Sequence, residues 1–199
     1  MHIEFLVEEP SAQVTLEILL PRLLPLQTTW HILTFSGKHD LLRKLPRLLR
    51  GYAGWMPDDY RIVVLVDEDR QDCINLKEQL EAAARQAGLS TKTGTQGGRF
   101  QVLNRIIVEE LEAWFLGDPE ALRAAYPNLP LGLPAVFSNP DAVSGGTWEA
   151  LERWLQRYGY FQGGYRKIEA ARQIAPHLHP DRNRSRSFHV FLEGLRALS

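Results

Sequence analysis

The sequence predicts an α/β fold with a parallel sheet, and three observations support this. Short apolar runs alternate with helical patterns through about residue 116, which is the order of parallel strands joined by crossover helices. The run YRIVVLV at 60–66 is almost continuously aliphatic, as expected of a central strand buried on both faces. The chain of 199 residues has the length of one domain.

Each expected element has its own pattern. The four apolar runs predicted as strands are 2–7, 30–35, 60–66 and 100–108. Segments with helical spacing follow the first three strands at 11–24, 39–50 and 72–87. Pro21 is expected to kink or end the first helix. A helix is also expected over 109–114, and another from Asp118, where a capping residue precedes a proline.

A stretch rich in Pro, Gly and Asn at 127–146 marks a loop or a boundary. Three further helices are expected after it, at 147–158, 165–175 and 187–198. Residues 1–126 are therefore predicted to form the α/β core. Residues 127–199 are predicted to form a loop and a C-terminal helical extension that packs on this core.

The bulk composition is that of a soluble globular protein, with 44% hydrophobic and 24% charged residues. The single cysteine, Cys73, excludes an internal disulfide and fits a reducing cytoplasm. The N-terminus has no basic leader, and no stretch approaches the roughly 20 apolar residues of a membrane span. We therefore expect a cytoplasmic protein without a membrane partner, and assign no oligomeric state.

Three of the expected strands end in carboxylates. Glu8 and Glu9 follow the first strand, 67–69 (DED) follows the third, and Glu109 and Glu110 follow the fourth, with Glu112 just beyond. Ligands of open parallel sheets bind beyond the carboxyl ends of the strands. These acidic residues are therefore expected at the same edge of the sheet.

Such a cluster predicts a divalent-metal site. Asp67 and Asp69 lie two apart on an extended segment, so their side chains should point the same way. Clustered carboxylates resist joint ionisation unless a cation compensates them, and oxygen ligands suit Mg²⁺ or Mn²⁺. The expected ligands are Glu8, Asp67 and Asp69, with Glu110 and Glu112 as further candidates. The alternative is that these acidic residues only cap the helices that follow.

The segment 166–186 is basic in a chain whose formal net charge is -1. It carries six cationic residues against Glu169 and Asp181: Arg166, Lys167, Arg172, Arg182, Arg184 and Arg186. Such a segment is most simply a solvated helix and loop, and alternatively a contact for a phosphate-rich partner. No phosphate-binding glycine motif follows the first strand.

The ordered motifs resemble a known fold family. FLVEE at the first strand and VLVDEDRQDC at the third are similar to the Toprim domains of topoisomerases, primases and overcoming-lysogenization-defect nucleases. More closely, the chain resembles a bacterial family placed among Toprim-like proteins. The residues that carry this resemblance are VEEPS at 7–11, DEDR at 67–70, ELEAW at 110–114 with Asp118, Lys167, and SRSF at 185–188.

The resemblance implies a Toprim-like, Rossmann-like sheet and phosphoryl-transfer chemistry. Glu8 would act as a catalytic acid–base group or metal ligand, and Asp67 and Asp69 would hold Mg²⁺ or Mn²⁺. Glu9 and Pro10 stand where the commoner Toprim pattern has a glycine after the catalytic glutamate, and Gln13 stands where many relatives have a glutamate. The proline stiffens the loop and leaves the catalytic assignment of Glu8 open, whereas Gln13 removes one extra ligand.

The implied activity is a metal-dependent nuclease that hydrolyses DNA or RNA. Arg70, Arg166, Lys167 and Arg186 would hold the phosphates of the nucleic acid. Because Toprim-like nucleases are often coupled to an ATPase, one alternative is a non-catalytic or ATPase-partnered interaction module, such as one of a phage-defence system. A second alternative is a phosphotransferase that acts on small molecules at the same acidic site.

Overall fold

The computed structural model describes residues 1–69, 71–95 and 98–198. In these residues, four strands form one all-parallel sheet in the order β2-β1-β3-β4, which confirms the predicted α/β class. The strands are β1 (His2–Val7), β2 (Thr29–Thr34), β3 (Tyr60–Asp67) and β4 (Val102–Ile107).

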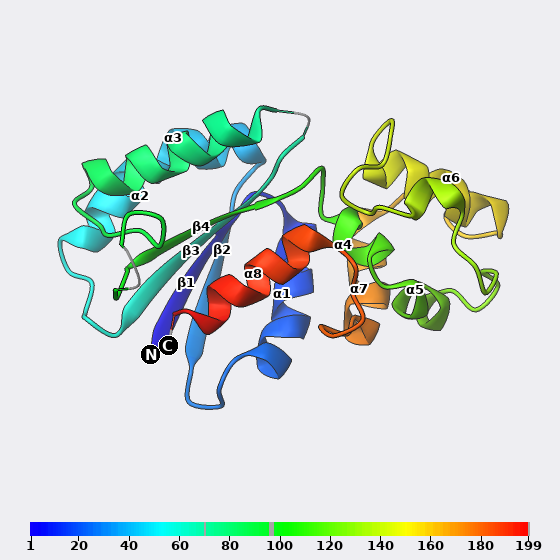
Figure 1. Ribbon diagram of the computed structural model, residues 1–199, viewed down its shortest axis with the longest axis horizontal. Helices are drawn as coiled ribbons and strands as arrows, with labels where there is room; N and C mark the ends of the chain where they lie inside the picture. Colours follow the sequence, from blue (N-terminus) through cyan, green and yellow to red (C-terminus); the bar gives the residue numbers. More distant parts are fainter. Residues whose placement is uncertain (70, 96–97, 199) are drawn as a thin grey trace.

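Helices cover both faces of the sheet and one of its ends. The helices of the described chain are α1 (Pro10–Leu23), α2 (Lys38–Ala53), α3 (Cys73–Gln86), α4 (Glu112–Leu116), α5 (Pro119–Ala125), α6 (Thr147–Arg157), α7 (Lys167–Ile174) and α8 (Arg186–Arg196), with 3-10 turns η1 (Ala135–Phe137) and η2 (Ala175–His177). Figure 1 shows α2 and α3 on one face, α1 and α8 on the other, and α4 to α7 gathered beyond one end of the strands.

The two covered faces explain the continuous aliphatic run of β3. Val63 and Leu65 belong to the hydrophobic cluster formed with α1 and α8. Ile62, Val64 and Val66 belong to the cluster formed with α2 and α3. Because alternate side chains of a strand point to opposite faces, a strand with two covered faces needs an apolar residue at every position.

The register brings the carboxyl ends of the strands to one edge. Val7 pairs with Thr34 of β2 and with Leu65 of β3, while Asp67 pairs with Ile107 of β4. The residues that follow each strand therefore meet at this edge, beside the helices α4 to α7 (Figure 1).

Two helix boundaries differ from the sequence-based expectation. The helix α1 continues past Pro21 and ends at Leu23. Its last hydrogen bond runs from Leu24 N–H to the Leu20 carbonyl at 2.9 Å. The helix expected over 109–114 begins only at Glu112. Glu109 has a φ of 61°, a left-handed conformation that interrupts a right-handed helix.

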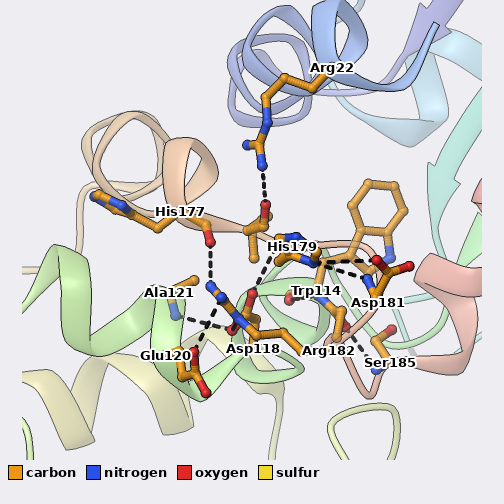
Figure 2. Close-up of polar contacts among 12 residues, drawn as sticks. Arg22, Trp114, Asp118, Glu120, Ala121, His177, His179, Asp181, Arg182 and Ser185 are labelled. Atoms are coloured by element: carbon orange, nitrogen blue, oxygen red, sulfur yellow. Dashed lines mark hydrogen bonds and ion pairs between the residues drawn. The ribbon is translucent and has the colours of Figure 1, made fainter.

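The C-terminal segment is fastened to α5 through the buried carboxylate of Asp118 (Figure 2). One carboxylate oxygen accepts from Ala121 N–H at 3.1 Å, which caps α5 as predicted, and from Arg182 Nε at 2.7 Å. The other accepts from His179 N–H at 2.8 Å. Arg22 of α1 adds hydrogen bonds to the carbonyls of Pro176 and Leu178.

A second set of contacts holds the start of α8. Asn183 donates to the Trp114 carbonyl at 2.8 Å, and Trp114 Nε1 donates to Ser187 Oγ at 3.1 Å. Gly117 fits closely against this turn, because a Cβ at that position would lie 2.1 Å from Asn183 Oδ1. One hydrophobic cluster runs from the sheet to α7 and α8. The proposed division at residue 126 stays a prediction.

Within the described chain, no helix combines the length and the apolar character needed to cross a bilayer.

Candidate metal centre

Three carboxylates converge at the carboxyl edge of the sheet. Glu8 follows β1, Asp67 is the last residue of β3, and Asp69 lies two residues further along. Each offers one oxygen, and these oxygens all lie within 4.8 Å of one another. Glu8 and Asp67 are buried, at 6% and 3% exposure, whereas Asp69 is open to solvent. The structure thus brings together the three residues predicted as the primary metal ligands.

The loop that carries Asp69 has a strained backbone. Asp69 has a φ of 48°, and Glu109 opposite it has a φ of 61°. The two residues are joined by a hydrogen bond from Asp69 N–H to the Glu109 carbonyl at 3.0 Å, and Glu109 N–H donates to the Glu68 carboxylate at 3.1 Å. Left-handed non-glycine residues cost about 1–3 kcal/mol and gather at functional sites. Asp69 therefore joins the cluster by a turn, and not by the extended geometry expected from the sequence.

Lys38 is a fourth member of the site. Its ammonium lies 2.9 Å from Asp69 Oδ2 and donates to the carbonyls of Asp67 and Glu68, both at 2.9 Å. The sequence analysis missed this residue. The available signal was its position just beyond β2, because the carboxyl end of that strand lies at the same edge of the sheet.

The pKa values of the two buried carboxyl groups in this cluster are raised. Burial, and then the charge of Asp69, raises the pKa of Glu8 to about 7, although Lys38 opposes this shift. Burial, and then the charge of Glu8, raises the pKa of Asp67 well above its usual range. Glu8 Oε2 is buried and has no hydrogen-bond partner in the described structure. Neighbouring carboxylates of this kind ionise together only when a cation joins them.

These side chains fit a small divalent cation. With bonds of about 2.1 Å, neighbouring oxygens on one octahedral Mg²⁺ ion are about 3.0 Å apart and opposite ones about 4.2 Å apart. The three oxygens lie within 4.8 Å of one another, so movements of about an ångström each bring them to these distances. The ligand set is carboxylate only, which suits Mg²⁺ or Mn²⁺. Glu8 Oε2, which has no partner, is a ready ligand atom.

Glu110 and Glu112 lie outside this group of three in the described structure. Glu110 Oε2 accepts from Thr147 N–H at 3.0 Å, Thr147 Oγ1 at 2.7 Å and Trp148 N–H at 3.0 Å. Glu110 therefore caps the start of α6, the role given as the alternative for the acidic residues.

Glu112 is fully buried beside the site, and neither of its carboxylate oxygens has a hydrogen-bond partner within the described residues. Burial raises the pKa of Glu112 to about 7, while the charge of Lys167 opposes the shift. Lys167 also lies 3.4 Å from Glu9 Oε2, and these acidic neighbours raise the pKa of its ammonium. Lys167 thus compensates the carboxylates around the metal centre.

The other residues predicted to bind nucleic acid are Arg166, Arg186 and Arg70. Arg166 is exposed and forms an ion pair with Glu169 at 2.8 Å. Arg186 is exposed at the start of α8, where its backbone N–H donates to Asp141 at 2.5 Å. Arg70 lies outside the described residues. Their assignment to nucleic acid stays a prediction.

The chain matches one known protein family over most of its length. A family model described as "Domain of unknown function (DUF4276)" matches residues 7–196. The chain belongs to the DUF4276 family. The match begins beside Glu8 and ends with α8, so DUF4276 includes both the sheet with its acidic edge and the C-terminal helices. No curated protein and no solved structure matches this DUF4276 chain.

Proposed function

We propose that this DUF4276 protein is a Mg²⁺- or Mn²⁺-dependent phosphodiesterase that acts on nucleic acid. The observation that carries the proposal is the convergence of the Glu8, Asp67 and Asp69 oxygens within 4.8 Å at the carboxyl edge of a parallel sheet. The resemblance of the motifs around Glu8 and Asp67 to Toprim domains points to the same chemistry.

The three carboxylates have different roles in this proposal because they differ in burial. Asp67 is fixed in the last position of β3, and one of its oxygens accepts from Leu111 N–H at 3.3 Å. Asp69 is exposed and meets solvent and substrate first. When bound, the divalent ion supplies Lewis-acid activation and charge stabilisation for phosphoryl transfer.

Glu8 is placed either to hold the metal or to accept a proton. In hydrolysis the oxygen of water bonds to phosphorus while one phosphorus–oxygen ester bond breaks. The proton released by the water passes to a general base, and the departing alkoxide takes a proton from solvent. Glu8 fits the base because one of its oxygens has no other partner among the described residues. Lys38 and Lys167 place positive charge around the anionic phosphate.

Incubation of the protein with labelled single- and double-stranded DNA and RNA, in Mg²⁺ and separately in Mn²⁺, tests this proposal. We expect metal-dependent cleavage of at least one substrate, and a loss of at least about 100-fold in rate in Asp67→Asn, because the ion would lose its buried ligand. Intact substrates in both metals would contradict the proposal. Cleavage by Asp67→Asn at the wild-type rate would also contradict it, by showing a contaminating nuclease.

One observation favours a second function, a non-catalytic module that works with an ATPase. The ammonium of Lys38 lies 2.9 Å from Asp69 and already neutralises part of the acidic cluster without a metal. A protein that had lost catalysis would keep its sheet edge stable in this way. Absence of Mn²⁺ binding, together with co-purification of an ATPase, would favour this function.

A further inference from the structure

A groove lies between the edge strand β2 and the helix α2. Its volume is about 780 Å³. Cationic residues of α2 form one wall: Arg43, Lys44 and Arg47. The carboxylate of Asp40 pairs with Arg43 at 2.5 Å and with Lys44 at 2.6 Å, while Arg47 is exposed and has no ion pair among the described residues. Three cations against Asp40, and against the Glu4 carboxylate beside Tyr52, leave this α2–β2 groove with a net positive charge.

Aromatic rings form another part of the α2–β2 groove. Trp55 is 59% exposed, and its ring centroid lies 5.6 Å from that of Tyr52. Phe35 lies at the other end, with the Lys44 ammonium 5.7 Å from its ring centroid. An exposed aromatic ring beside cationic side chains is the combination found on surfaces that bind single-stranded nucleic acid, where bases stack and phosphates pair.

One end of the groove lies near the acidic site. Phe35 N–H donates to the Val7 carbonyl at 3.0 Å, which places this end of the groove one residue from Glu8. The helix that carries Arg47 begins at Lys38, whose ammonium contacts Asp69. Arg47 is nine residues beyond Lys38, about 14 Å along the helix. A polymer spans this distance, whereas a mononucleotide does not.

We propose that the α2–β2 groove binds single-stranded nucleic acid and directs one of its phosphates to the acidic site. The second half of this inference rests on the proposed function, whereas binding in the groove does not. A second copy of the chain is a poor occupant, because two such grooves would bring their cations together. A duplex is also a poor occupant, because its bases are not free to stack on Trp55.

The test is fluorescence anisotropy with labelled oligothymidylate and oligouridylate of about 12 nucleotides, in EDTA so that no cleavage occurs. We expect Trp55→Ala to weaken the binding of at least one of the two about tenfold. We expect the double variant Lys44→Ala, Arg47→Ala to weaken binding at least as much and to reduce its salt dependence. The matched control is Arg153→Ala, Arg157→Ala on the exposed side of α6, away from α2 (Figure 1).

Equal losses in the groove variant and the α6 control would overturn the inference, because only net charge would then matter. Unchanged binding in all variants would overturn it as well. Tighter binding of the corresponding duplex would overturn the single-strand assignment. Binding of polyglutamate with the same sensitivity to Lys44 and Arg47 would overturn it in favour of an acidic protein partner.

Hydrolysis of a small phosphodiester, bis(p-nitrophenyl) phosphate, with Mn²⁺ separates the two proposals. If the wild type hydrolyses this compound and the groove substitutions leave oligonucleotide binding unchanged, the proposed function is supported and the groove assignment is overturned. Groove-dependent binding without cleavage of this compound or of any nucleic acid supports the groove and overturns the proposed function.

Discussion

The carboxyl group of Glu8 shows how single residues set the chemistry of this edge. It is buried, it faces two other carboxylates, and one of its oxygens has no partner among the described residues. Val7 before it and Ala12 after it are packed in the core, which keeps this part of the chain in place when Glu8 ionises. The folded protein therefore holds a destabilising charge that a divalent cation would relieve.

This arrangement predicts that stability without metal falls as pH rises. The pKa of Glu8 is about 7 in the folded state against 4.5 as its ordinary value, so the folded state binds more protons across this window. The free energy of unfolding then decreases from pH 4.5 to 7, by about 3 kcal/mol for Glu8 alone. Chemical denaturation in EDTA across this range measures the decrease.

The Glu8→Gln variant should lose the Glu8 share of this decrease, whereas Glu17→Gln on the exposed side of α1 should retain the whole decrease. Burial of Glu112 contributes its own decrease with the same sign, because its pKa is also raised from 4.5 to about 7. A Glu8→Gln protein with the full wild-type pH dependence would contradict the electrostatic account.

The residues of the site were predictable to different degrees. Glu8 and Asp67 follow directly from strand ends in a parallel sheet, a rule that needs no side-chain detail. Asp69 was predicted because an extended segment would point its side chain the same way as that of Asp67. In the structure Asp69 reaches the cluster through a left-handed turn, held by a hydrogen bond to Glu109, which follows the next strand. Glu110 was a further candidate ligand; it accepts hydrogen bonds from Thr147, 37 residues away, which no local pattern shows, and its metal assignment stays a prediction.

At the scale of elements, the short helices around the acidic edge depend on buried polar caps. The helix α5 has seven residues, too few to be stable alone. Asp118 at its start is fully buried and binds Ala121, His179 and Arg182. Through these bonds one carboxylate fixes the start of α5 and the chain segment that leads to α8.

Replacement of Asp118 by Ala should therefore destabilise the protein by about 2–4 kcal/mol, because it removes a cap and leaves Arg182 without its buried partner. Glu120→Ala removes only the exposed carboxylate on the same arginine, 3.2 Å from Arg182 Nη1, and should cost less than about 0.5 kcal/mol. Thermal or chemical unfolding compares the two variants. Equal costs would show that Asp118 is no more than a surface partner of Arg182.

Element positions were predictable where a local pattern dominates. The aliphatic run of β3 and the helical spacing over 72–87 are such patterns, and the structure has β3 at Tyr60–Asp67 and α3 at Cys73–Gln86, with Asp72 as its cap. The passage of α1 through Pro21 was missed, because packing of Leu16, Leu19 and Leu20 in the core offsets the lost hydrogen bond.

At the scale of the whole molecule, a parallel sheet covered on both faces leaves its carboxyl edge as the natural place for chemistry. The helices α4 to α7 gather beside this edge (Figure 1), and they bring Glu112 and Lys167 to the carboxylates. The DUF4276 match spans the sheet and these helices together. The sequence predicted the sheet, whereas the arrangement of the C-terminal helices depends on contacts such as Asn183 with Trp114 that join distant segments.

The most direct test of a divalent-metal site is calorimetric titration of Mn²⁺ near pH 8, where the carboxyl groups lose their protons most easily. The wild type is compared with Asp67→Asn, Asp69→Asn. The control is Asp58→Asn, Asp59→Asn, which changes two exposed aspartates just before β3, at the opposite edge of the sheet. We predict that the wild type and the control bind Mn²⁺ and that the Asp67, Asp69 variant does not. Equal binding in all three proteins, or none in the wild type, would contradict the metal site.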